Sequence, residues 1–439
     1  MKPGRRSMLG LALLGGVGSA LGAAAARPLA TLDGELAAIA ADRTCQLASL
    51  SVLAIRNGKV AYQQQFGQRF MAANGLPSQP ANSESLFRIA SISKMMTTLA
   101  AMRLVEEGKL SLDADVGTFL GFPLRNPHFP DKVITLRHIL SHTASLRDVA
   151  GYSFPATVTL QSFLTPGQAQ YGQGAMWASN AAPGAYFTYS NLGWGVVGTM
   201  MERVTGERFD RLMKRLLLDP LGMRGGFHPA ALPAVDLANL ATLYRKRTTD
   251  TEIWNAAGPW IAQVDDYSVN APASPAGIDN AVIGTNATPF SPTGGLRVSA
   301  EGMGKVMLML MNGGMHDGRR ILKPATLKLM LTRQWSADAT GSNGDTHHGL
   351  FRHWGLGNQH FPDRNGTRLV EGGGFEAIGH LGEAYGLMSA FALDLTAKTG
   401  MVVLAGGVSS NPELYKGTYS SLSRFEEKIL TALHKHVTR

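Results

Sequence analysis

The sequence predicts an α+β fold in which an antiparallel sheet, flanked by helices, carries an inserted all-helical domain. Strand patterns occur near both ends of the 439-residue chain, and the stretch between them has the periodicity of helices and long loops. With 44% hydrophobic and 17% charged residues, the composition is that of a globular chain long enough for two core-bearing units. We therefore expect a discontinuous α/β sheet domain from residues 31–86 and 293–439, and a mainly helical domain with substrate-pocket loops from residues 87–292.

The first 26 residues have the pattern of an export signal. Lys2, Arg5 and Arg6 precede an uncharged run rich in Gly, Ala and Leu, which ends in small residues before Arg27. The adjacent arginines resemble a twin-arginine signal with cleavage near Ala26, and an uncleaved membrane anchor is the alternative. The run is Gly-rich and only weakly apolar, which disfavours an anchor. The sequence thus predicts a periplasmic or secreted protein with no stable membrane insertion after signal cleavage.

Local signals place the other elements. Two apolar runs, at residues 50–55 and 59–62, flank Asn57-Gly58, the strongest short-range hairpin signal, so two antiparallel strands are expected there. Further strands are expected at residues 387–395 and 401–404. Apolar residues three and four apart predict helices at residues 32–41, 92–107, 134–141, 191–204, 208–218, 300–311 and 326–331, and a final amphipathic helix with Leu422, Phe425, Ile429 and Leu433 on one face.

Residues 243–292 show no sustained period, and strands are not expected in this part of the chain. A loop of this length is usually functional or disordered. Trp254 and Trp260 favour an ordered wall of a substrate pocket.

Charge, cysteine and histidine patterns exclude several classes of partner. The formal net charge is +9, but the basic residues are scattered without a basic run or aromatic interleaving, so no nucleic-acid partner is expected. Cys45 is the only cysteine, so no intramolecular disulfide can form. Gly193 to Gly198 matches a dinucleotide fingerprint but lies within a helical pattern, and the histidines lack metal-type partners at usable spacing. We therefore expect neither a cofactor nor a metal.

The stretch Phe87–Lys94, with the sequence FRIASISK, begins the most regular apolar period of the chain. Ser91 is expected at the N-terminus of a helix with one buried face that ends at Gly108, and Lys94 lies one turn further on the same side. A serine hydroxyl becomes a nucleophile when a neighbouring group takes its proton, and a lysine between apolar walls can have a pKa low enough to do so. The alternative is a surface serine and lysine, because S-x-x-K alone often occurs by chance.

A second motif is Tyr189-Ser190-Asn191. The Tyr189 phenol can serve as a base or proton shuttle if a cation such as Lys94 stabilises the phenolate. The Asn191 amide can orient Lys94 or bind a substrate carbonyl. The alternative is a buried tyrosine followed by an asparagine that starts a helix.

A third motif is His380-Leu381-Gly382, at the start of a strand pattern. Gly382 would let this strand approach the nucleophile closely, and the N–H of Glu383 would complete an oxyanion hole with the N–H of Ser91. The alternative is a histidine that merely ends a strand.

From about residue 87 to the C-terminus, the chain resembles the serine beta-lactamase and penicillin-binding superfamily, in its class C-like branch of esterases, DD-peptidases and amide hydrolases. The resemblance rests on the three motifs and on segments 134–146, 293–300 and 318–330, which are similar to recurring family segments. It implies the fold of beta-lactamases and transpeptidases. It also implies roles for individual residues: Ser91 as the acylated nucleophile, Lys94 and Tyr189 as the proton-transfer pair, Asn191 as a lysine-orienting or substrate-contacting group, and Ser91 and Glu383 as the N–H donors.

Two details follow from the resemblance. Lys398-Thr399-Gly400 matches the family's third motif literally, but the family places that motif before two strands and the terminal helix, and only one strand follows Gly400. We therefore interpret it as a hairpin turn. No glutamate occurs between Gly108 and Met201, so the deacylating glutamate of class A beta-lactamases is missing, which favours a tyrosine-based mechanism.

The third motif departs from that of class C lactamases, because His380 replaces Lys and Leu381 replaces Thr. An imidazole that is neutral and an apolar side chain bind a substrate carboxylate less well than an ammonium and a hydroxyl. Together with the export signal, the resemblance implies an exported serine hydrolase that acts through an acyl-serine intermediate on a small-molecule or peptide-like ester or amide. The alternatives are a penicillin-binding protein or DD-peptidase, a beta-lactamase, and a protein that binds cell-wall peptides without turnover.

Overall fold

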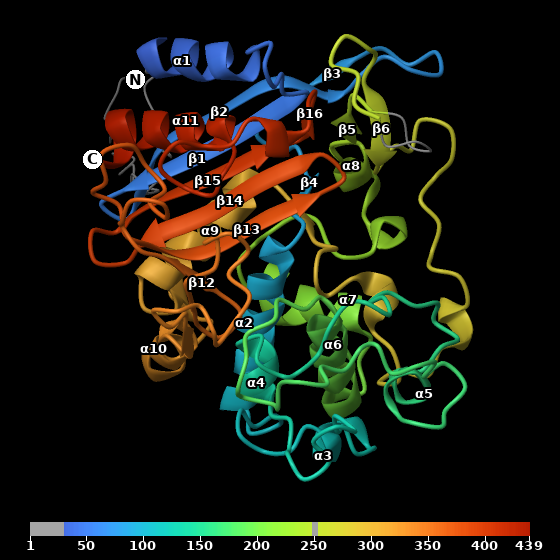
Figure 1. Cartoon of the computed structure of the whole chain (residues 1–439). Coiled ribbons are helices and arrows are strands. Elements are labelled where there is room, and N and C mark those ends of the chain that lie inside the picture. The colour runs from blue at the N-terminus through green and yellow to red at the C-terminus, as the bar shows by residue number, and fades with distance from the viewer. Residues whose placement is uncertain (1–29, 248–252) are drawn as a thin grey trace, which may run out of the picture.

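The computed structural model describes residues 30–247 and 253–439, and an antiparallel sheet lies at its centre (Figure 1). Within the described residues the strand order is β10-β11-β12-β13-β14-β15-β1-β2-β3, which places the first long strand beside the last one. The strands are β1 (Ser49–Arg56), β2 (Lys59–Phe70), β3 (Gln79–Pro80), β10 (Trp335–Ser336), β11 (His353–Trp354), β12 (Gln359–Phe361), β13 (Ala377–Ala384), β14 (Leu387–Asp394) and β15 (Thr399–Ala405).

The predicted hairpin at Asn57-Gly58 is confirmed. Arg56 of β1 pairs with Lys59 of β2, and the two residues between them have φ values of 52° and 69°. Positive φ at both central positions is the backbone of a type I′ turn, which Asn and Gly adopt at low cost. Lys398 likewise lies in the turn between β14 and β15, although Thr399 and Gly400 already belong to β15.

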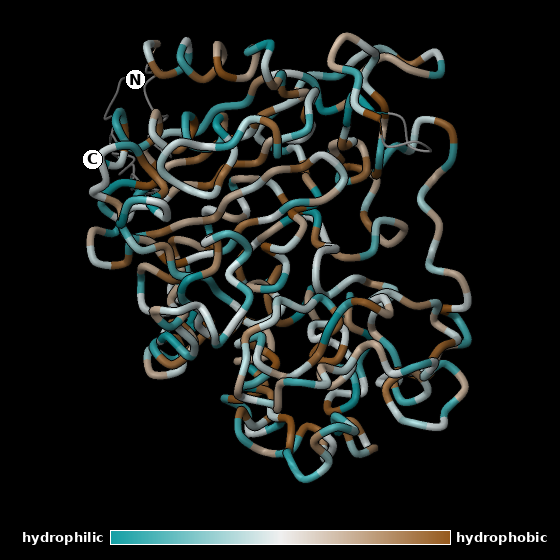
Figure 2. Tube along the Cα trace, viewed as in Figure 1, coloured by the Kyte–Doolittle hydropathy of each residue, from teal (hydrophilic) through white to brown (hydrophobic). Residues whose placement is uncertain are grey.

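Each face of the sheet contributes to a separate hydrophobic core. Leu50, Val52 and Ala54 of β1 pack in the core beneath α1 (Ala30–Ala40) and α11 (Arg424–Leu433), where Figure 2 shows hydrophobic residues along the strands. The alternate residues Leu53 and Ile55 join the larger core with α2 (Ile92–Glu106) and α9 (Ala300–Met311). This period of two is that of a strand buried on both sides. The final predicted helix is confirmed as α11.

In the chain, the helical part follows the N-terminal strands of the sheet and precedes its C-terminal strands. Figure 1 shows this part in cyan and green. α2 was expected to bury one face, but every residue from Ile92 to Met102 is buried. α2 contacts β13 and β14 on one side and α6 and α10 on others, so almost no side of it faces water. The main helices are α2 (Ile92–Glu106), α3 (Gly117–Leu120), α4 (Leu136–Leu140), α5 (Leu160–Leu164), α6 (Leu192–Thr205), α7 (Phe209–Met213, prolonged by a wider turn to Leu218), α8 (Ala234–Leu237), α9 (Ala300–Met311) and α10 (Pro324–Leu331).

The expectation that residues 243–292 contain no strand is wrong. β5 (Leu243–Arg245) and β6 (Ile261–Val264) pair antiparallel, and β5 also pairs in parallel with β16 (Gly407–Val408). Such short strands carry no readable period, and the partner of β5 lies far along the chain. The segment does line the cleft described below, but through residues such as Tyr267 and Phe290 and not through its two tryptophans.

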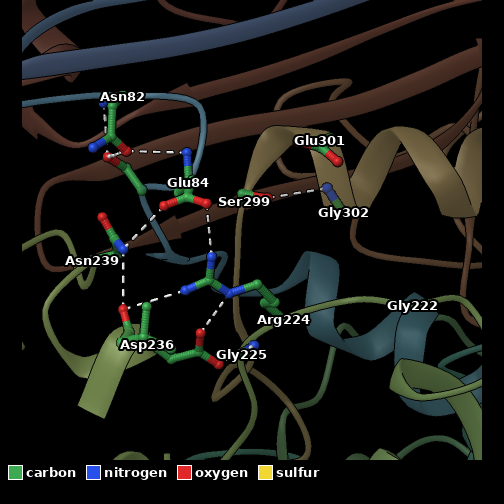
Figure 3. A network of polar contacts seen from close by, with 12 residues as sticks. Asn82, Glu84, Gly222, Arg224, Gly225, Asp236, Asn239, Ser299, Glu301 and Gly302 are labelled. Carbon is green, nitrogen blue, oxygen red and sulfur yellow. Dashed lines mark hydrogen bonds and ion pairs between the residues drawn. The ribbon is translucent and has the colours of Figure 1, made fainter. Parts of the chain in front are cut away.

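A polar network holds the segment that leads into β4 (Phe87–Arg88), as Figure 3 shows. Arg224 donates a hydrogen bond from Nε to Asp236 at 2.7 Å and another from Nη1 to Glu84 at 2.9 Å. Asp236 is buried, so this contact neutralises a carboxylate that would otherwise be costly to bury. The network therefore fixes the start of the chain segment that carries Ser91.

The predicted export signal at residues 1–26 lies outside the described residues and stays a prediction. Within the described residues, no helix has the length and apolar character needed to cross a membrane. The same part of the chain holds no cluster of three or more His, Cys, Asp or Glu side chains arranged to bind a metal ion.

Candidate active site

A cleft of about 1350 Å³ is lined on one side by β13 and on the other by residues of the helical part. Its volume exceeds the roughly 300–1000 Å³ common for small-molecule sites. All of the predicted site residues except one line this cleft, and the exception, Lys94, is fully buried behind Ser91. The lining set is Ser91, Tyr189, Asn191, His380, Gly382 and Glu383.

Ser91 precedes the first residue of α2, as the sequence analysis expects. Ala90 before it has a φ of 48°, an uncommon and costly conformation for a residue with a Cβ. The Ser91 side chain makes no capping bond to the helix, and its Oγ accepts a hydrogen bond from Lys94 Nζ at 2.9 Å. The backbone turn thus directs the hydroxyl to Lys94 at the floor of the cleft.

The Lys94 ammonium is surrounded by three oxygens. Its Nζ lies 2.9 Å from Ser91 Oγ, 2.7 Å from Asn191 Oδ1 and 3.2 Å from the Thr293 carbonyl oxygen. Burial lowers the pKa of Lys94 to about 7, while the nearby Asp148 carboxylate acts in the opposite direction. Near neutral pH, a large share of the molecules therefore carry a neutral amine that can accept the Ser91 proton.

Asp148, which the sequence analysis missed, fixes the orientation of Asn191. Its carboxylate accepts hydrogen bonds from the backbone N–H groups of Asn191 and Leu192, from Ser190 Oγ, and from Asn191 Nδ2 at 2.8 Å. With Nδ2 bound to Asp148, the Asn191 amide must present Oδ1 to Lys94. The carboxylate also lies at the N-terminus of α6, where the helix dipole favours negative charge. No local motif marks Asp148, because its partners lie more than forty residues along the chain.

The Asp148→Asn variant is expected to shift the pH profile of ester hydrolysis as well as its rate. Removing the charge takes away the interaction that raises the Lys94 pKa, so the acidic limb of kcat/KM should move to a pH below that of the wild type. The substituted amide also cannot accept the same set of hydrogen bonds, so kcat should fall by about tenfold or more. pH-rate profiles with a neutral ester measure both effects. Asp113→Asn is the matched control, since Asp113 pairs with Arg137 at the surface. An unmoved acidic limb would contradict the positioning role.

Tyr189 packs within an aromatic shell next to the nucleophile. Its ring stacks on His142 with centroids 4.4 Å apart and on Phe351 at 5.1 Å, and Lys94 Nζ lies 4.8 Å from its centroid. Burial raises the pKa of the Tyr189 phenol well above its usual value, and its hydrogen bond with Ser91 only partly offsets this. Since Lys94 loses its proton at a far lower pH, the expectation that a charged Lys94 stabilises a phenolate is not supported. The phenol stays protonated and is suited to donate a proton.

The edge of β13 beside Ser91 is open. β12 pairs with β13 only from Ala377 to Gly379. Ala384 of β13 and Leu387 of β14 flank a two-residue turn, so they form a hydrogen-bonded pair. Because the direction of the backbone N–H alternates along a strand, the N–H of Glu383 points away from β14 to the open edge. Among the residues that the structure describes, none accepts a hydrogen bond from the Ser91 N–H. Both predicted oxyanion donors are therefore available.

Gly382 lies where the strand passes the nucleophile turn. A Cβ at this position would stand 2.6 Å from the Ile89 carbonyl oxygen and 2.4 Å from Ser389 Oγ, which are distances that real Cβ atoms do not reach. Any larger residue would push β13 away from Ser91. This close approach is the one predicted from Gly382 in the third motif.

His380 lies inside β13 and is buried at the floor of the cleft, so it does not end the strand. Burial, with a smaller effect of the Lys94 charge, lowers the pKa of His380 to about 3. Its Nδ1 lies 2.5 Å from the Leu381 carbonyl oxygen, an acceptor, so Nδ1 carries the proton and Nε2 is left as an acceptor. His380 is thus uncharged at neutral pH, in agreement with the expectation that the third motif lacks a fixed cation.

Comparison with known proteins identifies the family. The Beta-lactamase family profile matches residues 34–422. A penicillin-binding protein of Bacillus subtilis (strain 168) is 28% identical over 173 residues, 39% of this chain and 36% of that protein. Esterase EstB of Burkholderia gladioli is 30% identical over 195 residues, 42% of this chain and 47% of the esterase. The chain thus spans less than half the length of these two relatives.

A solved structure shows the same fold. EstCE1, described as a hydrolase with promiscuous acyltransferase activity, is similar with a TM-score of 0.62 at 24% identity, over 92% of this chain and 99% of that one. The fold agrees with the sequence prediction of an antiparallel sheet with a helical insertion, so the predicted α+β class is confirmed. The resemblance noted from the three motifs is confirmed as well, because the family profile extends over most of the residues: the chain belongs to the Beta-lactamase family.

Proposed function

We propose that this protein is a serine hydrolase that forms an acyl-Ser91 intermediate with an ester or amide substrate and releases the acyl group to water. The contact of 2.9 Å between Lys94 Nζ and Ser91 Oγ is the observation that carries the proposal. It joins a hydroxyl at the cleft to a buried amine whose pKa is about 7, which is the pairing that nucleophilic catalysis needs at neutral pH.

In acylation, the neutral Lys94 amine takes the Ser91 hydroxyl proton as Oγ bonds to the substrate carbonyl carbon. The carbonyl oxygen becomes an oxyanion, which accepts hydrogen bonds from the N–H groups of Ser91 and Glu383. When the bond to the leaving group breaks, Tyr189 gives its proton to the leaving oxygen or nitrogen and regains one from the Lys94 ammonium. Asn191 and the Thr293 carbonyl hold the ammonium in place between these steps.

Deacylation reverses the path with water as the nucleophile. Water attacks the acyl carbon and passes a proton by way of Tyr189 to the Lys94 amine. The bond between the acyl carbon and Ser91 Oγ then breaks, and Oγ takes a proton from the Lys94 ammonium. A chromogenic ester such as p-nitrophenyl butyrate tests both halves of the cycle. The expected result is a burst of one nitrophenolate per protein chain followed by steady turnover. A burst without turnover would favour a protein that binds acyl groups without releasing them.

The third motif favours substrates without a carboxylate at that end of the cleft. The wild type is expected to hydrolyse short aryl esters far faster than nitrocefin, because His380 is uncharged and Leu381 cannot donate a hydrogen bond. Replacing both residues by Lys and Thr should shift kcat/KM toward nitrocefin by a few-fold to about 100-fold, the upper end being close to the full value of one charge-assisted hydrogen bond at about 1.5–3 kcal/mol. Efficient nitrocefin hydrolysis by the wild type at about pH 8 would contradict this selectivity.

A further inference from the structure

Arg88 is a cation in the cleft wall without a carboxylate partner. It stands on β4, three residues before Ser91, and lines the same cleft. Nε donates to the Gly294 carbonyl oxygen at 3.0 Å, and the guanidinium carbon lies 4.9 Å from the centroid of the Tyr385 ring. Within the described residues, Arg88 has no ion pair and neither terminal nitrogen donates a hydrogen bond. Arg88 is partly exposed and lines the cleft, so a bound molecule can reach its guanidinium.

The carboxylate whose charge acts on Arg88 is already committed elsewhere. Asp265 is buried and accepts two hydrogen bonds from Arg297, at 3.0 Å and 2.8 Å, and one from the Tyr267 hydroxyl at 3.0 Å. The two arginines face one another across the pairing of β4 with β7 (Arg297–Val298), so this wall of the cleft has two guanidinium groups for one carboxylate. Burial and the Arg297 charge lower the pKa of Arg88, but a guanidinium keeps its proton in proteins.

Arg88 and His380 lie at opposite ends of the cleft relative to the nucleophile. Along β13, Gly382 contacts the turn at Ala90, His380 lies two residues before it, and Tyr385, which stacks on Arg88, lies three residues after it. A substrate whose carbonyl carbon sits at Ser91 therefore has one arm toward an uncharged end and one arm toward a cation. Arg88 and Ser91 are three residues apart, so their Cα atoms are separated by at most about 10 Å.

We propose that Arg88 binds a carboxylate on the substrate, so that this enzyme acts on monoesters or monoamides of short dicarboxylic acids. The free guanidinium fork matches a carboxylate in a bidentate arrangement, and Tyr385 holds its plane from one face. Tyr152 lines the same cleft, so its hydroxyl is available as a second donor for the anion. The proposal rests on acylation of Ser91 as proposed above and specifies the class of acid.

The test compares matched p-nitrophenyl esters of succinate, glutarate, adipate and suberate, each with its free carboxylate and as the methyl ester. The wild type should prefer the free acid at one chain length by about tenfold or more in kcat/KM. Arg88→Gln should reduce this ratio by roughly 10- to 100-fold, and Arg88→Lys, which keeps the charge but not the fork, should retain part of it. Lys416→Gln is the matched control, because Lys416 lines the same cleft but pairs with Glu413, and it should keep the wild-type ratio.

The outcomes separate this inference from the proposed function. Steady hydrolysis of the methyl esters with no preference for any free acid would overturn the role of Arg88 and leave the serine hydrolase intact. If no ester is turned over, calorimetry with monomethyl glutarate and dimethyl glutarate still decides, since only the carboxylate form should bind and only when Arg88 is present. If Arg88→Gln folds poorly, Arg88→Lys supplies the second variant, and an unchanged preference for the free acid in Arg88→Lys would overturn recognition by the guanidinium fork.

Discussion

Ser91→Ala should abolish covalent labelling and lower ester hydrolysis by about 10⁴-fold or more. In the proposed mechanism the substitution removes the atom that bonds to the acyl group, while the oxyanion donors and the cleft remain, so a small residual rate over water is expected. Intact-mass measurement after treatment with a fluorophosphonate should show one adduct in the wild type and none in Ser91→Ala. Turnover of p-nitrophenyl butyrate, followed with the same samples, gives the loss in rate.

Other serines near the site serve as controls for this result. Ser153 also lines the cleft, so Ser153→Ala should keep both the adduct and the turnover. Ser93 is buried and its Oγ accepts a hydrogen bond from the Leu296 N–H, so it has no access to a reagent. An adduct on Ser93, Ser153 or Ser190 would refute the assignment of Ser91 as the nucleophile.

Lys94→Met and Tyr189→Phe should each lower kcat by about 10² or more, and the double variant should be little worse than either single one. The reason is that both residues move the same proton, so losing one disables the unit. In the wild type, kcat/KM should rise with pH through about 7 as Lys94 loses its proton, and it should stay level to beyond the ordinary phenol pKa of about 10. Fully additive losses, or a rate that falls as the pH rises through 7, would contradict a shared proton path.

Thermal unfolding tests whether the loss of activity in Lys94→Met is caused by misfolding. The pKa of Lys94 is lowered in the folded protein, so the unfolded chain binds more protons between pH 7 and about 10.5. This lysine therefore destabilises the fold most below pH 7, and its cost fades as the pH rises toward 10.5. Lys94→Met removes that cost, so at pH 6 the variant should unfold at no lower a temperature than the wild type, despite its loss of activity.

What the sequence could predict was local. The spacing of Ser91 and Lys94 is one helical turn, and Asn57-Gly58 is a complete turn signal, so both follow from neighbouring residues. The contact of Asp148 with Asn191 could not be read in this way, since a loop brings them together. Arg88 stands in the stretch that the sequence analysis singled out, but its free guanidinium depends on Asp265 being committed to Arg297. The low pKa of Lys94 likewise depends on walls from three distant segments.

The position of β1 in the sheet has a consequence for how the protein folds. β1 pairs with β15, with Leu50 opposite Ala405, so the centre of the sheet joins the two ends of the chain. Contacts between such distant residues carry a large loop-closure entropy and slow the search for the native state. Until β15 has been synthesised, the apolar edge of β1 stays unpaired and open to other chains. β13, which carries Glu383, reaches β1 only through β14 and β15, so we expect Ser91 and Glu383 to come together late, after the C-terminal hairpin has closed the sheet.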